Sequence, residues 1–578
     1  MPVKLIPYGI ADYKKIIEEK RAYVDKTAYI RSLEDAGDYI LFLRPRRFGK
    51  SLFASTLGHY YDRAQKDNFN LLFSGTDIGQ NPTTRKNAYY VLKFNFSGIR
   101  TNSDETLLKD FSQKVYSGIR GFRRTYQLDI TLEMDSPQAQ LTTFFDDFQE
   151  QCEGKIYIII DEYDNFANEL LSSNLKSYKK VISRDGFVRK FYEVLKEATE
   201  TIVDRIFITG VSPITLDSLT SGFNIAGNLS MDRDFNEMMG FTKSEVEQLI
   251  EETILPEVRP SDLMDTLAEY YNGYCFGEDG EERVFNSDMV LYYLKSYQRY
   301  HKPPRTLLDY NVVSDYKKLE NLIRFENPIQ NRTILKKVVS DGYIIAKLSE
   351  RFSIDQKFGD EHFKSLLFYL GLLTIKARKP GYVELQIPNI AMNGLYLEFL
   401  MDIISKEANY APVFEQIALA LDQLAYDNSC EKLTELVEGY LASISNRDAM
   451  NFSEKEVKQA MMIYAGMSDL YLVKSEYEVQ KKYIDFALLP LRNTPELDTQ
   501  VFELKYLKKK EVPDPTSEAG QKKIAEKLAE AEEQIGKYIS AREFLREKTS
   551  AWAIVFVGEK CIKRVVRTYE CNGDSARG

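Results

Sequence analysis

Two stretches of this 578-residue chain gather residue types that bind phosphate and divalent cations. The first is RPRRFGKS, residues 44–51, which fits the phosphate-loop pattern G-x-x-x-x-G-K-[ST] except that Arg44 stands at the first glycine. In that pattern the lysine reaches the β- and γ-phosphates, the serine hydroxyl binds Mg²⁺, and backbone N–H groups face the anion. A basic surface loop that contains GKS by chance is the alternative. The predicted nucleotide-binding residues are Arg46, Arg47, Phe48, Gly49, Lys50, Ser51 and Leu52.

An acidic strand end would complete a nucleotide site. The run IYIII, residues 156–160, is apolar and of strand length, and Asp161 and Glu162 follow it directly. Asp161 would hold the Mg²⁺ shell, and Glu162 would orient or deprotonate the attacking water. A strand ending in an acidic turn is the structural alternative, but both patterns in this order favour a nucleotide site.

A third apolar strand, in RIFITGVSP, ends in polar residues. We expect Thr209 to sense the γ-phosphate from this strand end; a threonine bonded to backbone is the alternative. Arg205, at the start of the same stretch, is a candidate arginine for the site of a neighbouring subunit.

A second set of chemical residues lies on two strand patterns late in the chain. Asp485 interrupts the apolar pattern of YIDFALLP, and VFELKYL carries Glu503 and Lys505. Residues i and i+2 of a strand point the same way, so Glu503 and Lys505 share one face. Asp485 and Glu503 offer hard oxygen ligands to Mg²⁺ or Mn²⁺, and Lys505 would position or polarise a water. The alternative is that Glu503 and Lys505 are alternating charged residues on an exposed edge strand and have no catalytic role.

Two flanking helices add candidates to this second set. Glu454 precedes the strands as an upstream acid, with Glu456 as a substitute. Gln534 and Tyr538 stand four residues apart beside the apolar stripe of a later helix, so they share one face. A half-buried pair without chemistry explains Gln534 and Tyr538 equally well.

Composition limits the class of protein. The formal net charge of −10 argues against a protein that coats nucleic acid through bulk charge, although a local basic groove is compatible with it. The five cysteines are scattered and the three histidines are few, so we expect no zinc site and a reducing, cytoplasmic location. The first residues lack a signal-peptide core, and the apolar runs have strand length, so we expect no membrane partner.

The middle of the chain offers elements without chemistry. Thr242 and Glu245 form a capping-box pattern that begins a helix, in a stretch rich in tyrosine that we interpret as core. The pair Pro303-Pro304 marks a linker, and FKSLLFYLGLLTIKARKPGYVEL predicts a helix followed by a hairpin.

The motifs together carry a resemblance to known families. The stretches YVDKTAYI, LRPRRFGKSLF, IIIDEYD, TGVSPITL and SGFN resemble the bacterial predicted AAA-ATPase-like family, which resembles AAA+ and STAND ATPases and has RPRRFGKS at this loop. The resemblance implies that the loop functions with Arg44 in place of glycine. The D…E-x-K residues resemble the PD-(D/E)XK nuclease domain that usually follows, and Gln534 with Tyr538 resembles the Q-x-x-x-Y pair of RecB-type nucleases.

The resemblance implies an α/β multidomain fold. It would place Tyr23, Asp25 and Lys26 near the adenine side of a nucleotide, and Lys481 or Lys482 would replace the Gly-Arg that precedes the aspartate in the nuclease family. The expected domains are a P-loop NTPase parallel-sheet core over 1–238, a winged-helix-like lid over 239–302, a connecting domain over 303–406 and a restriction-endonuclease-like PD-(D/E)XK domain over 407–578.

The combined expectation is an ATP-binding and ATP-hydrolysing nuclease that uses Mg²⁺ or Mn²⁺ and acts on nucleic acid, with DNA favoured. The ATPase module would gate cleavage, and defence against foreign DNA and assembly into a homo-oligomer are compatible with this interpretation. The alternative is a nucleotide-switched, STAND-like sensor whose C-terminal domain binds nucleic acid or protein without cleaving it. A processive ATP-driven machine is disfavoured because no helicase motif series is evident.

Overall fold

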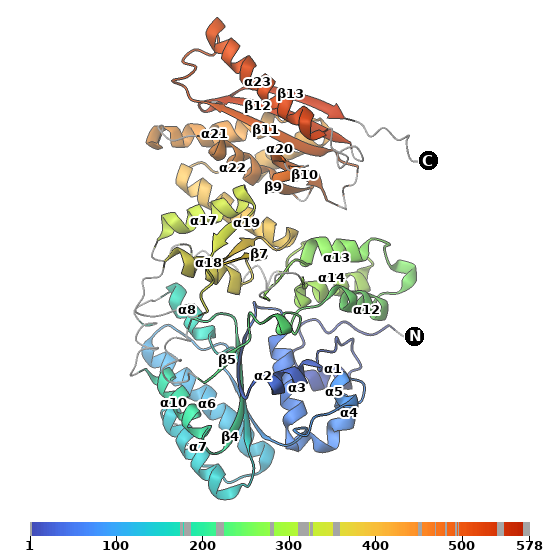
Figure 1. Ribbon diagram of the computed structural model, residues 1–578, viewed down its shortest axis with the longest axis vertical. Coiled ribbons are helices and arrows are strands. Elements are labelled where there is room, and N and C mark those ends of the chain that lie inside the picture. The colour runs from blue at the N-terminus through green and yellow to red at the C-terminus, as the bar shows by residue number, and fades with distance from the viewer. Residues whose placement is uncertain are drawn as a thin grey trace. The chain divides into compact units, whose positions relative to one another are not determined.

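The chain forms two compact units in a computed structural model of residues 1–578 (Figure 1). The first unit comprises Met1–Pro328 and Ile345–Asn389, and the second comprises Ile329–Ile344 and Ile390–Gly578. The predicted boundaries at 238, 302 and 406 stay predictions. The residues that the structure describes are 3–133, 135–173, 177, 186–214, 225–277, 282–309, 323, 327–350, 359–448, 453–468, 470–479, 482–491, 494, 496–539 and 548–569. The SGFN motif, residues 221–224, lies outside these ranges.

A parallel β-sheet organises the first unit, as the resemblance to the AAA-ATPase-like family implied. Five strands pair in parallel in the order β2-β3-β4-β1-β5. Every residue of β3 is buried, as expected for an apolar run inside a sheet that is covered on both faces. The strands are β1 (Tyr39–Leu43), β2 (Tyr90–Asn95), β3 (Ile156–Asp161), β4 (Val203–Gly210) and β5 (Gly227–Asn228).

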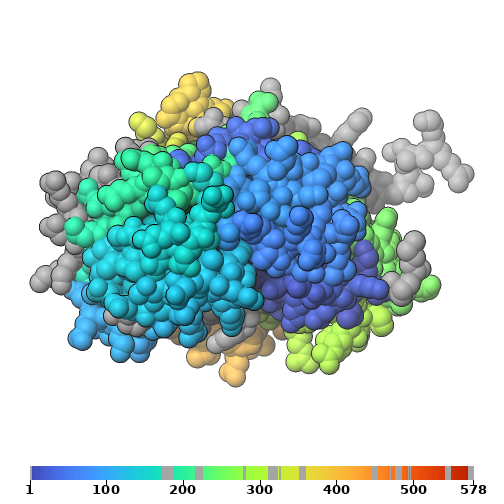
Figure 2. Space-filling model, turned by 90° about the horizontal axis from the view of Figure 1, so that it is seen from below, coloured from blue at the N-terminus to red at the C-terminus, as the bar shows by residue number. Residues whose placement is uncertain are grey.

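Helices lie on both faces of this sheet (Figure 1). In the space-filling view of Figure 2, the blue N-terminal segment and the cyan segment that contains α7 form adjoining parts of the surface. Because parallel strands end at one edge, the phosphate loop, the acids after β3 and the end of β4 meet there. One face carries α2 (Tyr29–Ala36) and α3 (Lys50–Tyr61), and the other carries α6 (Asp104–Tyr126), α7 (Pro137–Gln151) and α10 (Phe187–Ala198).

Further helices and a small sheet complete the first unit. The predicted capping box is confirmed: Thr242 and Glu245 bond reciprocally at the start of α12. The tyrosine-rich stretch is buried, as predicted for core residues, and includes Tyr271 and Tyr274. The predicted helix and hairpin are confirmed as α18, β7 and β8. The bounds are α12 (Lys243–Thr253), α13 (Leu263–Tyr271), α14 (Ser287–Tyr300), α18 (Asp360–Tyr369), β6 (Ile344–Ala346), β7 (Thr374–Lys379) and β8 (Tyr382–Gln386).

A mixed sheet organises the second unit. Its order is β13-β12-β11-β10-β9, with β11 and β12 parallel and the other neighbours antiparallel. Within the described ranges, every helix is too short or too polar to cross a lipid bilayer. The strands are β9 (Tyr471–Val479), β10 (Lys482–Pro490), β11 (Thr499–Leu507), β12 (Thr549–Val557) and β13 (Lys560–Tyr569), and the helices include α17 (Pro328–Asp341), α19 (Ile390–Ala408), α20 (Phe414–Tyr426), α21 (Glu431–Asp448), α22 (Glu454–Ala465) and α23 (Glu518–Ile539).

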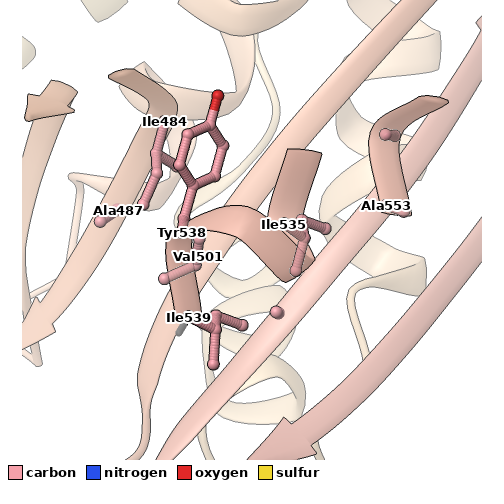
Figure 3. Close-up of a cluster of buried hydrophobic side chains, with 9 residues drawn as sticks. Ile484, Ala487, Val501, Ile535, Tyr538, Ile539 and Ala553 are labelled. Atoms are coloured by element: carbon pink, nitrogen blue, oxygen red, sulfur yellow. The ribbon is translucent and has the colours of Figure 1, made fainter. Parts of the chain in front are cut away.

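The core between α23 and the mixed sheet fixes the face of each strand. Figure 3 shows Ile535, Tyr538 and Ile539 of α23 beside Val501 of β11 and Ala487 of β10. Because Val501 faces α23, the residues two and four positions later in β11 face the same side. The opposite side is packed by a row of stacked rings, Phe486, Phe502 and Trp552.

Candidate functional site

The phosphate loop forms one wall of a cavity in the first unit. Helix α3 begins at Lys50, directly after Gly49, whose φ of 91° is a left-handed conformation that glycine adopts at low cost. The cavity has a volume of about 660 Å³, which is the size of a small-molecule or nucleotide pocket. The seven predicted nucleotide-binding residues of the loop, Arg46 to Leu52, line it, whereas the predicted Asp161 and Thr209 are not among its lining residues.

Arg44, at the position of the missing glycine, points into the protein. Its side chain is 1% exposed and its guanidinium stacks on Phe42 and Phe276, 4.2 and 4.4 Å from the ring centroids. Burial lowers the pKa of Arg44 to about 9. Arg44 therefore anchors the loop from behind and leaves the cavity wall to the residues after it. It donates hydrogen bonds to the backbone oxygens of Leu43, Ser230 and Phe235.

Lys50 joins the loop to the acidic strand end. It is 4% exposed, and its ammonium donates to the backbone oxygen of Pro45 at 3.0 Å. Burial lowers its pKa, while the charges of Glu162 and Asp161 act in the opposite direction. A buried ammonium on the cavity wall is suited to bind a phosphate that enters the cavity.

Asp161 offers an unpartnered oxygen next to the phosphate loop. It is 7% exposed, lies beside the Ser51 hydroxyl, which acts to lower its pKa, and accepts from Asn95 Nδ2 at 3.2 Å. Burial raises its pKa, and its Oδ1 has no hydrogen-bond partner in the described part of the chain. A carboxylate oxygen beside a serine hydroxyl suits Mg²⁺, so these residues fit the metal of a nucleotide complex.

Asn95 was not predicted as a site residue. It ends β2 directly opposite Asp161 of β3 and lines the cavity. The signal that could have found it is a polar residue closing an apolar strand, but only the strand pairing brings that residue to Asp161.

Glu162 lines the cavity from the turn after β3. Its backbone is left-handed, with φ at 55°. Asn165 bonds it twice: the backbone N–H donates to the Glu162 carbonyl at 3.2 Å and the side-chain amide donates to Oε2 at 3.3 Å. The carboxylate lies beside the predicted metal ligands, where it could orient a water; that role stays a prediction.

Two residues of β4 are used inside the fold. Thr209 is fully buried, and its hydroxyl donates to the Phe42 carbonyl at 2.9 Å. This contact matches the alternative of a threonine bonded to backbone. The role of Thr209 as a γ-phosphate sensor stays a prediction. Arg205 is also buried, where it pairs with Asp38 at 2.9 Å and donates to two backbone carbonyl groups. The terminal nitrogens of Arg205 thus have partners within its own unit, and its service to a neighbouring subunit stays a prediction.

The rest of the cavity wall comes from the N-terminal segment and from α14 with the loop before α12. Tyr23 and Lys26 line it, and Lys26 donates to Glu245 at 2.7 Å. Asp25 instead accepts from the backbone N–H groups of Thr27 and Asp77. This wall is largely apolar, which suits the face of a nucleobase. Its apolar members include Ile10, Val24, Met238, Met239, Phe241 and Leu291.

The second predicted site lies where β10 and β11 separate. The two strands pair as far as Phe502 of β11. Beyond it, a carboxylate replaces β10 as hydrogen-bond acceptor, because the Leu504 N–H donates to Asp485 Oδ2 at 2.8 Å. Glu454 lies near the Tyr506 N–H, which acts to lower its pKa. Two acids from β10 and α22 therefore lie on one edge of β11.

Glu503 and Lys505 form a buried pair at this opening. The Lys505 ammonium donates to Glu503 Oε1 at 2.8 Å. Glu503 is 4% exposed, and its Oε2 has no partner in the described part of the chain. Burial, followed by the charge of Asp485, raises the pKa of Glu503 to about 7. Burial alone would lower the pKa of Lys505, but the charges of Glu503 and Glu454 outweigh it and raise that pKa.

The predicted residues on the two flanking helices have different surroundings. Glu454 interacts with Lys505 and Asp485, whereas Glu456 accepts from the backbone N–H of Ser453 as part of a helix cap. Burial raises the pKa of Tyr538, and the negative charges of Glu503 and Asp485 act in the same direction. Tyr538 therefore lies near the same carboxylates. Gln534 Oε1, one helical turn earlier, is buried without a partner among the described residues. Lys481 and the Lys482 side chain lie outside the described residues.

The donor set of this opening fits a divalent cation bound together with a phosphate. The described residues hold no group of three or more Asp, Glu, His or Cys side chains arranged to bind a metal. Mg²⁺, however, commonly binds through one or two carboxylates and completes its shell with water and substrate phosphate. Asp485 and the unpartnered oxygen of Glu503 are the two carboxylates that would offer such ligands.

Two family models match separate segments of the chain. Residues 7–220 match the family described as "Predicted AAA-ATPase", and residues 452–565 match the "PD-(D/E)XK nuclease superfamily". The first segment is therefore similar to the AAA-ATPase-like family and the second to the PD-(D/E)XK nucleases. The phosphate loop and its acids lie in the ATPase-like region, and Asp485, Glu503 and Lys505 lie in the nuclease region. Such families usually use a nucleotide and a divalent metal.

One curated relative is the "Uncharacterized protein in vnfD 5'region" of Azotobacter chroococcum mcd 1, which is 26% identical over 297 residues. The match covers 51% of this chain and 53% of the relative, so the chain spans about half the length of that protein.

Proposed function

We propose that this chain is a metal-dependent nuclease regulated by ATP binding and hydrolysis. The ATPase-like region would bind ATP with Mg²⁺ in the cavity that the phosphate loop lines. Hydrolysis would change how this loop packs against α12 and α14, and that change would gate cleavage by the nuclease region. DNA is the proposed substrate, since the nuclease family acts on nucleic acid and DNA is its usual substrate.

The ATPase chemistry would be divided among residues on the cavity wall and Asp161 directly beside it. Lys50, with Arg46 and Arg47, would balance the charge of the phosphates. Ser51 and Asp161 would hold Mg²⁺, and Glu162 would orient or deprotonate the attacking water. The buried, unpartnered oxygen of Asp161 supports this assignment.

In the nuclease region, Asp485 and Glu503 would hold Mg²⁺ or Mn²⁺. When bound, the cation supplies Lewis-acid stabilisation of the charge that develops on the phosphate. Lys505, fixed by Glu503, would position the attacking water, and Glu454 would add negative charge on the same strand edge. Gln534 and Tyr538 would orient the substrate from α23.

The observation that carries the nuclease proposal is the 2.8 Å contact between Lys505 and Glu503 beside the carboxylate of Asp485. The test is cleavage of linear, circular and single-stranded DNA and of RNA, with Mg²⁺ or Mn²⁺ and with or without ATP. Lys505→Ala should abolish cleavage and spare folding. The exposed Lys563→Ala on β13 is the matched control. Wild-type cleavage by Lys505→Ala would refute the site.

The alternative is a nucleotide-switched, STAND-like sensor that binds nucleic acid or protein without cutting. The lack of a three-ligand metal group in the described residues is the observation that favours it. Titration with Mg²⁺ and Mn²⁺ separates the two proposals: a sensor binds its target with no metal-dependent cleavage, whereas the nuclease cuts only with metal present.

The proposed setting is cytoplasmic defence against foreign DNA, with a homo-oligomer as a compatible assembly. ATP hydrolysis per chain, measured over a hundredfold range of protein concentration, tests whether subunits complete each other's sites; a constant rate would argue for an independent subunit.

A further inference from the structure

The turn that presents Glu162 is fastened to the end of β4 by a buried carboxylate. Asp164 is 0% exposed. It accepts from the backbone N–H of Ser212 at 2.7 Å and from the Ser212 hydroxyl at 3.1 Å. The Val211 N–H and the Asn168 side-chain amide, at 2.5 Å, donate to it as well. Both oxygens of Asp164 are therefore used by groups that lie after β4 or on α8 (Asn165–Ser173).

A second residue of the same turn repeats this attachment. The Tyr163 N–H donates to the Thr209 carbonyl at 3.2 Å, and the Tyr163 hydroxyl donates to the Ser212 carbonyl at 2.6 Å. Gly210 makes room for both side chains: a Cβ at this position would lie 2.3 Å from Asp164 Oδ1 and 2.4 Å from the Tyr163 ring. The end of β4 is therefore shaped to receive the turn.

Glu162 depends on this attachment for its position. It adopts a left-handed backbone that non-glycine residues populate only when the surroundings impose it. The hydrogen bonds of Glu162 described above go to Asn165, inside the same turn, so they cannot fix the turn against the sheet. The contacts of Asp164 and Tyr163 are the ones that cross to another strand.

The donors around Asp164 favour a carboxylate. The Ser212 N–H and the Asn168 amide donate to Oδ2, and the Val211 N–H is shared between Oδ1 and Oδ2. The Ser212 hydroxyl lies 3.1 Å from Oδ2 and 2.7 Å from Asn168 Oδ1. The amide nitrogen of an asparagine would bring a hydrogen toward another donor. An Asp164→Asn variant therefore keeps the size of the side chain and disrupts the attachment.

We propose that Asp164 is a positioning residue for ATP hydrolysis, which locks the turn of Glu162 to the end of β4 and so sets the Glu162 carboxylate. The inference rests on the proposed ATPase function. Asp164 itself does not line the cavity and would not touch the nucleotide.

The test is a double-mutant cycle on the full chain, with steady-state ATP hydrolysis and binding of a fluorescent ATP analogue as readouts. Asp164→Asn should lower kcat by about tenfold or more, with KM and analogue affinity within about threefold of wild type. In a Glu162→Gln background the same substitution should leave the residual kcat unchanged, because the residue it acts through is already disabled. The exposed Asp129→Asn is the matched control.

A second variant covers the case in which Asp164→Asn does not fold. Gly210→Ala removes no polar group but displaces Asp164 and Tyr163, so it should also lower kcat and should have no further effect with Glu162→Gln. Wild-type kcat in both variants, or losses that multiply with that of Glu162→Gln, would overturn the inference while leaving the ATPase proposal intact. Absence of ATP hydrolysis by the wild-type chain would refute both the inference about Asp164 and the ATPase proposal.

Discussion

The carboxylate of Asp485 accepts a hydrogen bond at 2.8 Å from the backbone N–H of Leu504, a group that a regular antiparallel partner strand would have taken. Glu454 lies near the N–H of Tyr506 on the same strand edge, and that N–H acts to lower the pKa of Glu454. The strand pairing therefore ends at the residues that carry the acids. Asp485 satisfies a backbone donor on the exposed edge of β11, and the two acids bring negative charges beside Glu503 and Lys505.

Metal binding at this opening should depend on pH through Glu503. Its pKa is raised to about 7, so the metal-free carboxyl is largely protonated below that pH. A cation must displace that proton, so Mn²⁺ affinity should rise about tenfold per pH unit up to about pH 7 and level off above it. Isothermal titration with Mn²⁺ between pH 6 and pH 8.5 measures this, and Glu503→Gln is the control that should bind weakly at every pH. A flat profile for the wild type would contradict the assignment of Glu503 as a ligand.

Glu454 and Glu456 form a natural matched pair of variants. Glu454→Gln removes a charge beside Lys505 and should lower the cleavage rate at least tenfold. Glu456→Gln touches the helix cap of Ser453 and should lower the free energy of unfolding by at most about 1 kcal/mol without changing cleavage. Urea unfolding and initial cleavage rates separate the two effects. Equal cleavage rates for the two variants would remove Glu454 from the site.

Restoring the missing glycine of the phosphate loop should harm the protein. Arg44→Gly leaves three backbone carbonyl groups without their donor and removes the stacking on Phe42 and Phe276. We expect a loss of about 3 kcal/mol or more in the free energy of unfolding and weaker nucleotide binding. Differential scanning calorimetry and analogue binding are the measurements. Arg233→Ala, at an exposed arginine, should change neither.

Local patterns in the sequence were enough to predict the elements that carry both sites. The apolar run before Asp161 predicted a strand ending at the acids, and the spacing of Glu503 and Lys505 predicted that they share a face; both are confirmed. These features depend on periodicities of a few residues. The separation of β10 from β11 was not predictable, because it depends on which backbone groups Asp485 reaches.

Residues whose roles depend on distant partners escaped prediction. The sequence marked Arg44 only as a departure from the glycine of the pattern, whereas its partner Ser230 lies 186 positions later. Asp164 was not among the predicted residues, and its partner Ser212 lies 48 positions away. Thr209 was placed on the correct strand, but the sequence could not tell that its hydroxyl would bond the neighbouring strand β1.

The direction of the proposed gating can be measured with a chain that binds ATP but does not hydrolyse it. Glu162→Gln keeps Lys50, Ser51 and Asp161 and should bind the ATP analogue within about threefold of wild type, while hydrolysis falls a hundredfold or more because the group that orients or deprotonates water is lost. With ATP held in place, cleavage should be fixed at the level of the ATP-bound state, above or below that of the nucleotide-free chain. Lys50→Ala, which should not bind ATP, gives the nucleotide-free level as control. Identical cleavage by the two variants across the ATP titration would show that the two regions are not coupled.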